Sequence, residues 1–117
     1  VVPQTPLREL VEDYCYKYHY KMFPVTQDGR LSGCVSTRVI KEVPQTAWDR
    51  QTVAEIAEPC SEANTIAPDA DAVEAISVMK KSGNSRLMVV EGDRLKGVIT
   101  LKDMLDFLAM KVDLEGD

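Results

Sequence analysis

The second half of this chain repeats the first. Residues 29–36 read GRLSGCVS, and residues 93–100 read DRLKGVIT, an offset of 64 positions. At the same offset, Phe23-Pro24-Val25 is matched by Leu87-Met88-Val89. A repeat of this length in a chain of 117 residues predicts two similar halves related by a pseudo-twofold axis. Two such half-domains are expected to share one core, with binding sites in the clefts between them.

The hydrophobic pattern predicts the same order of elements in both halves. In the first half it predicts a helix that begins near Thr5 as its N-cap, strands over 23–26 and 31–36, and a short helix over 37–43. In the second half it predicts a strand over 65–68, a helix over 71–81, strands over 87–90 and 94–99, and a helix over 100–110. The fold class is therefore α/β (α+β), with two β-α-β-β-α repeats and a truncated first strand in repeat 1.

The repeat also divides the chain. We expect repeat 1 over residues 1–44, a connector over 45–60 and repeat 2 over 61–117. Within the connector, residues 52–56 are typical of a short helical turn, and Trp48 is expected to anchor it by burial.

The composition limits the kinds of partner that the chain can bind. A formal charge of −5 and a pI near 4.9 argue against nucleic acid, which needs a basic face. Three unevenly spaced cysteines and one histidine predict reduced thiols in a cytoplasmic protein and no metal site. The chain has neither a membrane-spanning run nor a secretory signal. It begins without Met, so a transmembrane part outside it is compatible with the sequence, and would place the domain on the cytoplasmic face of a membrane.

No arrangement of residues suggests catalysis. The sequence contains no Ser-His-Asp set, no activated Cys-His pair, no P-loop and no suitably placed pair of carboxylates. We therefore predict that the chain is not an enzyme, and we assign no catalytic residue and no certain cofactor.

Three segments of the second half resemble a known family. They are Pro68-Asp69-x-x-Ala72-x-Glu74-Ala75, the strand 87–90, and Gly97-Val98-Ile99-Thr100-x-x-Asp103. With the repeat, they make the chain similar to a tandem pair of cystathionine-β-synthase (CBS) domains, also called a Bateman module. The resemblance implies adenine nucleotides (AMP, ADP or ATP) or S-adenosylmethionine as candidate ligands in the cleft between repeats, and regulation of an attached domain.

A narrower similarity concerns residues 10–14, 23–25 and 43–48. They resemble the CBS pair attached to site-2-protease-like intramembrane metalloproteases, which implies a membrane metalloprotease domain in the same full-length chain. No HExxH motif occurs here, so any such chemistry would lie outside this sequence.

The resemblance places a candidate ligand site at the start of the last helix. In the family, the hydroxyl and carboxylate at the positions of Thr100 and Asp103 hold the ribose hydroxyls. The same spacing is also a capping box, in which both side chains satisfy backbone amides without any ligand. In repeat 1 the equivalent residues are Ser36 and Val39, and family members often carry Thr where Glu58 stands here. We therefore predict one competent site, in repeat 2, and one degenerate site.

Four further residues complete the candidate site. Arg86 matches a position that meets phosphate in nucleotide-binding relatives, with Ser85 beside it; the alternative is an exposed Arg paired with a local Glu. Tyr20 and Lys21, from the other repeat, would add a stacking face and a positive charge, although Lys21 could equally be a solvated surface residue.

Apolar side chains on the helices suggest self-association. Tyr14 and Tyr18 share a helix face and are interpreted as core or interface rather than as a base-stacking ladder. Met104, Leu105 and Leu108 would either join the core or form a helical dimer face, so a homodimer is expected. The leading hypothesis is a ligand-sensing regulatory module; the alternative is a structural dimerisation or docking module with vestigial clefts.

Overall fold

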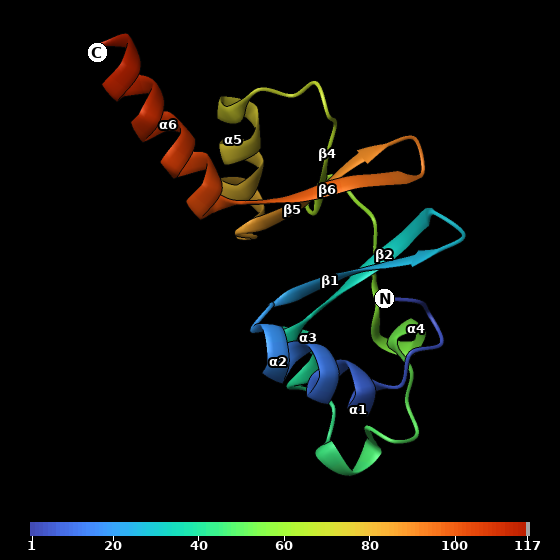
Figure 1. Ribbon diagram of the computed structural model, residues 1–117. Helices are drawn as coiled ribbons and strands as arrows, with labels where there is room; N and C mark the ends of the chain where they lie inside the picture. Colours follow the sequence, from blue (N-terminus) through green and yellow to red (C-terminus); the bar gives the residue numbers. More distant parts are fainter. Residues whose placement is uncertain (117) are drawn as a thin grey trace. The chain divides into compact units, whose positions relative to one another are not determined.

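The computed structural model describes residues 1–116 and divides the chain into two compact units, residues 1–60 and residues 61 onward (Figure 1). The last position of the expected second repeat, 117, lies outside the described residues. Each unit is built on one antiparallel hairpin with helices beside it, so the architecture is the predicted mixture of helices and strands.

The hairpin of unit 1 joins β1 (Met22–Gln27) to β2 (Arg30–Ser36). It pairs Met22 with Ser36 and has a register shift between Val25 and Thr26. A two-residue strand from the connector, β3 (Glu58–Pro59), adds to the other edge of β2. Residues 58–60 therefore belong structurally to unit 1.

The helices of unit 1 are short. A helical segment runs through α1 (Leu7–Leu10), a π-helical turn η1 (Val11–Cys15) and α2 (Tyr16–Tyr18). After the hairpin come α3 (Thr37–Ile40), the 3₁₀ turn η2 (Gln45–Ala47) and α4 (Val53–Ile56). α4 thus lies within the predicted connector, where a short helical turn was expected, and the Thr52 side chain makes no cap hydrogen bond.

The predicted N-cap of the first helix is wrong by one residue. Pro6 occupies the cap position of α1 and makes no side-chain cap, while Thr5 is buried. The carbonyl of Thr5 accepts a hydrogen bond from the amide of Val53 (2.8 Å), and the amide of Leu7 donates to the carbonyl of Gln51 (3.0 Å). Contacts with the connector, more than 40 positions away, therefore decide where this helix starts.

Unit 1 has a filled core. Its largest cluster of buried residues combines the helices and both hairpin strands, and it includes Val53 of α4, which is completely buried. Val1 lies beside β1: its ammonium group donates to Pro24 (3.1 Å) and its carbonyl accepts from Thr26 (2.8 Å). Val1 thus stands at the position that the truncated first strand would occupy.

Unit 2 repeats this plan with longer helices. Its elements are β4 (Thr65–Ile66), α5 (Ala72–Ser82), β5 (Arg86–Glu91), β6 (Arg94–Thr100) and α6 (Leu101–Glu115). β4 runs parallel to β5, and β5 is antiparallel to β6. The register shift between Val89 and Val90 falls 64 residues after that in β1, so the repeat holds even for this irregularity.

The core of unit 2 is smaller. Ala75, Met79 and Leu87 are buried, with Ile99 and Met104 packed against them. The last helix has no buried residue and continues five residues beyond the predicted end, to Glu115. Figure 1 shows its far end projecting beyond α5. Apolar side chains are exposed along this helix: Leu105, Phe107, Met110, Val112 and Leu114.

The tyrosines are not core residues. Tyr14 is 36% exposed and Tyr18 47%, so the interpretation of this pair as core is wrong, while an interface role stays a prediction. The π-helical turn between residues 11 and 15 changes the spacing on which that expectation rested. In residues 1–116, no helix is long and apolar enough to cross a membrane.

Candidate functional site

Four of the predicted site residues meet at one end of the unit 2 hairpin. Arg86, the first residue of β5, is paired with Thr100, the last residue of β6. The carbonyl of Ser85 accepts a hydrogen bond from the amide of Leu101 (2.8 Å), which ties the start of α6 to the start of β5. Asp103 follows in the first turn of α6, so a strand-to-helix corner places all four residues together.

Only half of the capping box is formed at this corner. The Thr100 hydroxyl accepts a hydrogen bond from the backbone amide of Asp103 (3.0 Å). The Asp103 side chain is exposed, and within residues 1–116 its carboxylate makes no reciprocal hydrogen bond to the Thr100 amide. The cap therefore uses the hydroxyl and leaves the carboxylate oxygens available.

The same corner in unit 1 shows that the cap does not require the carboxylate. There the Ser36 hydroxyl accepts from the amide of Val39 (3.4 Å), and the carbonyl of Lys21 accepts from the amide of Thr37 (3.0 Å). Val39 stands where Asp103 stands in unit 2. Because the helix is capped without an acidic residue in unit 1, capping alone does not explain Asp103.

Arg86 is held by its neighbour rather than by an acid. Its guanidinium donates to the Ser85 hydroxyl (3.2 Å), and no ion pair of Arg86 is found in the part of the chain that the structure describes. The alternative, an Arg86 side chain paired with a local Glu, is therefore not observed in the described residues. A half-buried guanidinium with unused donors can bind an anion in a bidentate manner.

Lys102 is already paired on α6 itself. Its ammonium group lies 3.0 Å from the carboxylate of Asp106, one turn further along, and this hydrogen bond raises the pKa of Lys102. Both side chains are largely exposed, so the pair adds little stability. Arg86 is consequently the cation of this corner that has no acidic partner among the described residues.

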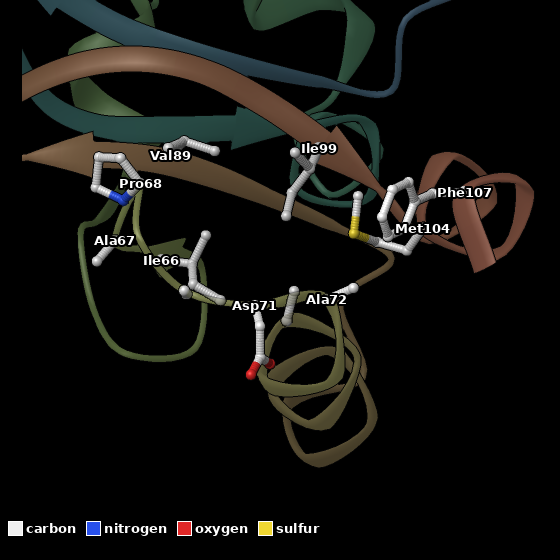
Figure 2. A pocket seen from close by; sticks show the side chains of 11 residues that line it. Ile66, Ala67, Pro68, Asp71, Ala72, Val89, Ile99, Met104 and Phe107 are labelled. Carbon is white, nitrogen blue, oxygen red and sulfur yellow. The ribbon is translucent and has the colours of Figure 1, made fainter. Parts of the chain in front are cut away.

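An apolar cavity of about 240 Å³ lies within unit 2 (Figure 2). Ile66 and Pro68 line it on one side, Val89 and Ile99 come from the hairpin, and Met104 and Phe107 come from α6. Four alanines complete much of the remaining wall: Ala67, Ala70, Ala72 and Ala75. The lining includes none of the four residues at the corner. Asp103 directly precedes Met104 in α6 and lies one helical turn before Phe107, and both of these residues line the cavity.

Figure 2 shows how the polar and apolar groups are separated. Ile66, Ile99 and Met104 extend toward the centre of the view, whereas the Asp71 carboxylate points away from them. That carboxylate caps α5, accepting from the amide of Glu74 (2.8 Å). The cavity is therefore suited to a flat, largely apolar group, with hydrogen-bonding partners at its edge.

Larger buried side chains stand at the equivalent positions of unit 1. At an offset of 64 residues, Val11 stands for Ala75 and Ile40 for Met104, and both are buried. Val53 of α4 is buried in the same cluster. The Glu58 carboxylate, expected to disfavour phosphate unless paired, lies 3.7 Å from the guanidinium of Arg38.

The remaining predicted residues, Tyr20 and Lys21, lie in unit 1. Lys21 is exposed and hydrogen-bonds through its carbonyl, and the Tyr20 ring packs on Phe23 and Tyr18. Their part in a site built on unit 2 stays a prediction. The described residues include no cluster of three or more His, Cys, Asp or Glu side chains that could hold a metal ion.

Sequence reasoning missed the cavity itself. The resemblance to the family singles out the segment 68–75, but it does not predict that this segment forms a wall of small side chains. The signal was present in the sequence: four alanines fall within nine residues, where unit 1 carries the larger residues Pro3, Pro6, Arg8 and Val11.

A β-α-β-β-α unit with a capped corner beside an apolar cavity is the class of half-domain that the sequence predicted. Residues 53–110 match the family model described as "CBS domain". The chain therefore contains a CBS domain over these residues, and the resemblance stated from its motifs is confirmed.

Two curated relatives carry the narrower similarity. A zinc metalloprotease of Methanocaldococcus jannaschii is 29% identical over 98% of this chain, and Rip3 of Mycobacterium tuberculosis, assigned to the zinc metalloproteases, is 28% identical over 80%. The chain spans only 31% and 25% of the length of these proteins.

Solved structures agree on the fold. A CBS domain-containing protein of unknown function from Bacillus anthracis has a TM-score of 0.81 at 17% identity, covering 96% of this chain and 84% of that one. The CBS domain of a bacterial CNNM/CorC family Mg²⁺ transporter, solved in complex with ATP, has a TM-score of 0.76 at 18% identity, covering 92% and 76%.

Proposed function

We propose that this chain is a non-catalytic regulatory module that binds an adenosine-containing ligand through unit 2. The observation that carries the proposal is an open apolar cavity beside a carboxylate that the helix cap does not use. The purine base would occupy the cavity, Asp103 would accept hydrogen bonds from the ribose hydroxyls, and Arg86 with Ser85 would meet a phosphate or carboxylate.

The candidate ligands are AMP, ADP, ATP and S-adenosylmethionine. That a CBS domain of similar fold was solved with ATP supports this choice. Tyr20 and Lys21 would complete the site from the first repeat. In this proposal, residues 1–44 and 61–117 are the two repeats, residues 45–60 connect them, and only the second repeat retains a competent corner.

The regulated partner is, in this proposal, a metalloprotease domain of the same full-length chain, with the module on the cytoplasmic side of a membrane. The similarity to two zinc metalloproteases over most of this chain supports the association. Ligand binding would control the attached domain only to the extent that the ligand binds two conformations of the module with different affinity.

Isothermal calorimetry on the purified chain tests the ligand site. AMP, ATP and S-adenosylmethionine are titrated separately, and at least one is expected to bind. Asp103→Asn keeps the size of the side chain but removes its charge, and should weaken binding at least tenfold, because ribose hydroxyls then lose a charged acceptor.

Val39→Asn is the matched control, since Val39 occupies the same helical position in unit 1. It should leave the affinity unchanged. Absence of binding for all three compounds, or an equal effect of both substitutions, would contradict the proposal.

A second candidate function is favoured by one observation, the apolar surface of α6. Leu105 and Val112 are exposed and lie on one face, seven residues apart. A homodimer through this helix would cover them. Sedimentation equilibrium should then show a concentration-dependent dimer that Leu105→Ser with Val112→Ser abolishes and Asp113→Ser does not; a dimer without any ligand binding would favour a purely structural module.

A further inference from the structure

All four tyrosines of the protein lie within residues 14–20 of unit 1. Each is exposed: Tyr14 by 36%, Tyr16 by 65%, Tyr18 by 47% and Tyr20 by 60%. We call these residues, with Lys17, His19 and Lys21 between and beside them, the tyrosine patch. So much aromatic surface in one short segment is uncommon for a residue type that is usually at least half buried.

Three of the four rings, those of Tyr14, Tyr18 and Tyr20, form one ordered surface. Tyr18 and Tyr20 are stacked with centroids 5.7 Å apart, and Tyr14 lies 6.3 Å from Tyr18. Tyr14 and Tyr20 both pack on the buried Phe23 of β1. The patch is thereby fixed to the hairpin core, so little side-chain entropy would be lost when it meets another surface.

The patch is also basic in an acidic protein. Residues 14–21 contain two lysines and no carboxylate, whereas the whole chain has a formal charge of −5. Lys17 lies over the ring of Tyr18 at 5.4 Å. Nearby on the same helix, Glu12 is paired with Arg8 at 3.2 Å, and Asp13 is an exposed acid. The patch therefore complements an anionic partner.

From this combination we propose that the tyrosine patch docks on an anionic lipid membrane surface. Tyrosine rings place their apolar part in the interfacial region while their hydroxyls reach water and headgroups. Lysines beside them are attracted to negatively charged lipid. His19 ends the preceding helix with a left-handed conformation (φ 62°), which turns the chain sharply between Tyr18 and Tyr20 and gathers both on one corner.

Two other partners fit less well. In a symmetric contact between two copies, the patch would meet itself, and Lys17 and Lys21 would face like charges. Single-stranded nucleic acid stacks its bases on open ring faces, but Tyr18 already has Tyr20 against it and Lys17 over it. Both partners are tested alongside lipid below.

The test is co-sedimentation of the purified chain with phosphatidylcholine vesicles that contain 30% phosphatidylserine, at low salt. The chain should bind these vesicles and should bind pure phosphatidylcholine vesicles much more weakly. Lys17→Gln should weaken binding about fivefold, because one cation near the membrane is lost. Tyr18→Ser should weaken it further, because this ring contacts both Tyr14 and Tyr20, and Asp13→Asn should strengthen it.

The matched control is Lys81→Gln. Lys81 is exposed on α5 and stands 64 residues after Lys17, so it changes the net charge equally at the equivalent place of unit 2. It should leave vesicle binding unchanged. The patch shares Tyr20 and Lys21 with the proposed ligand site, so neither is substituted in this test. Lys17, Tyr18 and Asp13 are outside that site, so failure here leaves the ligand proposal standing, and calorimetry tests that proposal independently.

Three outcomes overturn the inference. They are equal binding to neutral and anionic vesicles, equal effects of Lys17→Gln and Lys81→Gln, and no vesicle binding by a chain that instead binds oligouridine or self-associates through the patch. Far-ultraviolet circular dichroism and the melting temperature of each variant separate loss of binding from loss of fold.

Discussion

Units 1 and 2 have the same hairpin but use it differently. In unit 1, Val11, Ile40 and the connector residue Val53 are buried in one cluster with residues of the hairpin. In unit 2, alanines at 72 and 75 leave a cavity of about 240 Å³, and the helix that follows carries Asp103 where unit 1 has Val39. The capped strand-to-helix corner is common to both.

The comparison separates architecture from recognition. What both units keep, namely the register shift and the cap, is what the fold needs. What differs is side-chain volume and one carboxylate. Substitutions that exchange these features between equivalent positions are therefore the most direct way to test the comparison.

The largest effect is expected at Gly33. A Cβ built there would collide with the backbone carbonyl of Glu58, because β3 approaches β2 closely at this point. Gly33→Ala should lower the free energy of unfolding by about 3 kcal/mol, since backbone must move to relieve the clash. Its counterpart Gly97 has open space, so Gly97→Ala should change stability by less than about 0.5 kcal/mol.

Urea denaturation of both variants measures this difference. Equal stabilities for the two alanine variants would mean that the close approach of β3 to β2 is not maintained in solution.

The second effect concerns Cys34, which is 5% exposed. Burial, with a smaller contribution from Glu58, raises the pKa of its thiol to about 11. In the unfolded chain the thiol has a pKa near 9. Below that pH the folded and the unfolded chain both keep the thiol proton, so the buried neutral thiol makes its full contribution to stability. Between pH 9 and 11 only the unfolded chain releases it, so stability should fall by about 2 to 3 kcal/mol.

Cys34→Val introduces the residue that unit 2 carries at position 98. The variant should lose less stability than the natural chain between pH 9 and 11, as measured by urea unfolding at each pH. The exposed Cys60, changed to Ser, should alter this dependence much less. Parallel curves for the natural chain and Cys34→Val would show that the thiol is not buried in solution.

A third, smaller effect should follow from filling the cavity of unit 2. Ala75→Val introduces the side chain that unit 1 has at position 11, and it should weaken ligand binding about tenfold, or about 1.4 kcal/mol. Stability should change little, because the added methyl groups enter existing space. Calorimetry measures the affinity, and Ala109→Val on the exposed face of α6 is the control.

The hairpins were predictable in detail because two local signals indicate them, the alternation of apolar and polar residues and the residues of the turns. Both signals occur twice, once in each repeat. The corner with Thr100 and Asp103 was predictable for the same reason: its contacts span three residues. The resemblance to the family then supplied the ligand hypothesis that local physics could not.

The rest depends on contacts between distant parts of the chain. The start of α1 is decided by Gln51 and Val53 rather than by the capping preference of Thr5. The cavity exists because small side chains leave space unfilled, and hydrophobic periodicity carries no information about side-chain volume. Tyr14 and Tyr18 do lie side by side, with ring centroids 6.3 Å apart, but their helix contains a π-helical turn, which no simple periodic pattern predicts, and both rings are exposed.

The smallest effect distinguishes the two uses of the corner. Ser36→Ala and Thr100→Ala each remove a hydroxyl that accepts a backbone amide at the start of a helix, so each should cost about 1 kcal/mol in urea unfolding. Only Thr100→Ala should also weaken ligand binding, because only that hydroxyl stands beside Asp103 and the cavity. If both substitutions cost the same stability and neither alters affinity, the hydroxyl of unit 2 serves the helix alone, as it does in unit 1, and recognition would rest on the carboxylate without it.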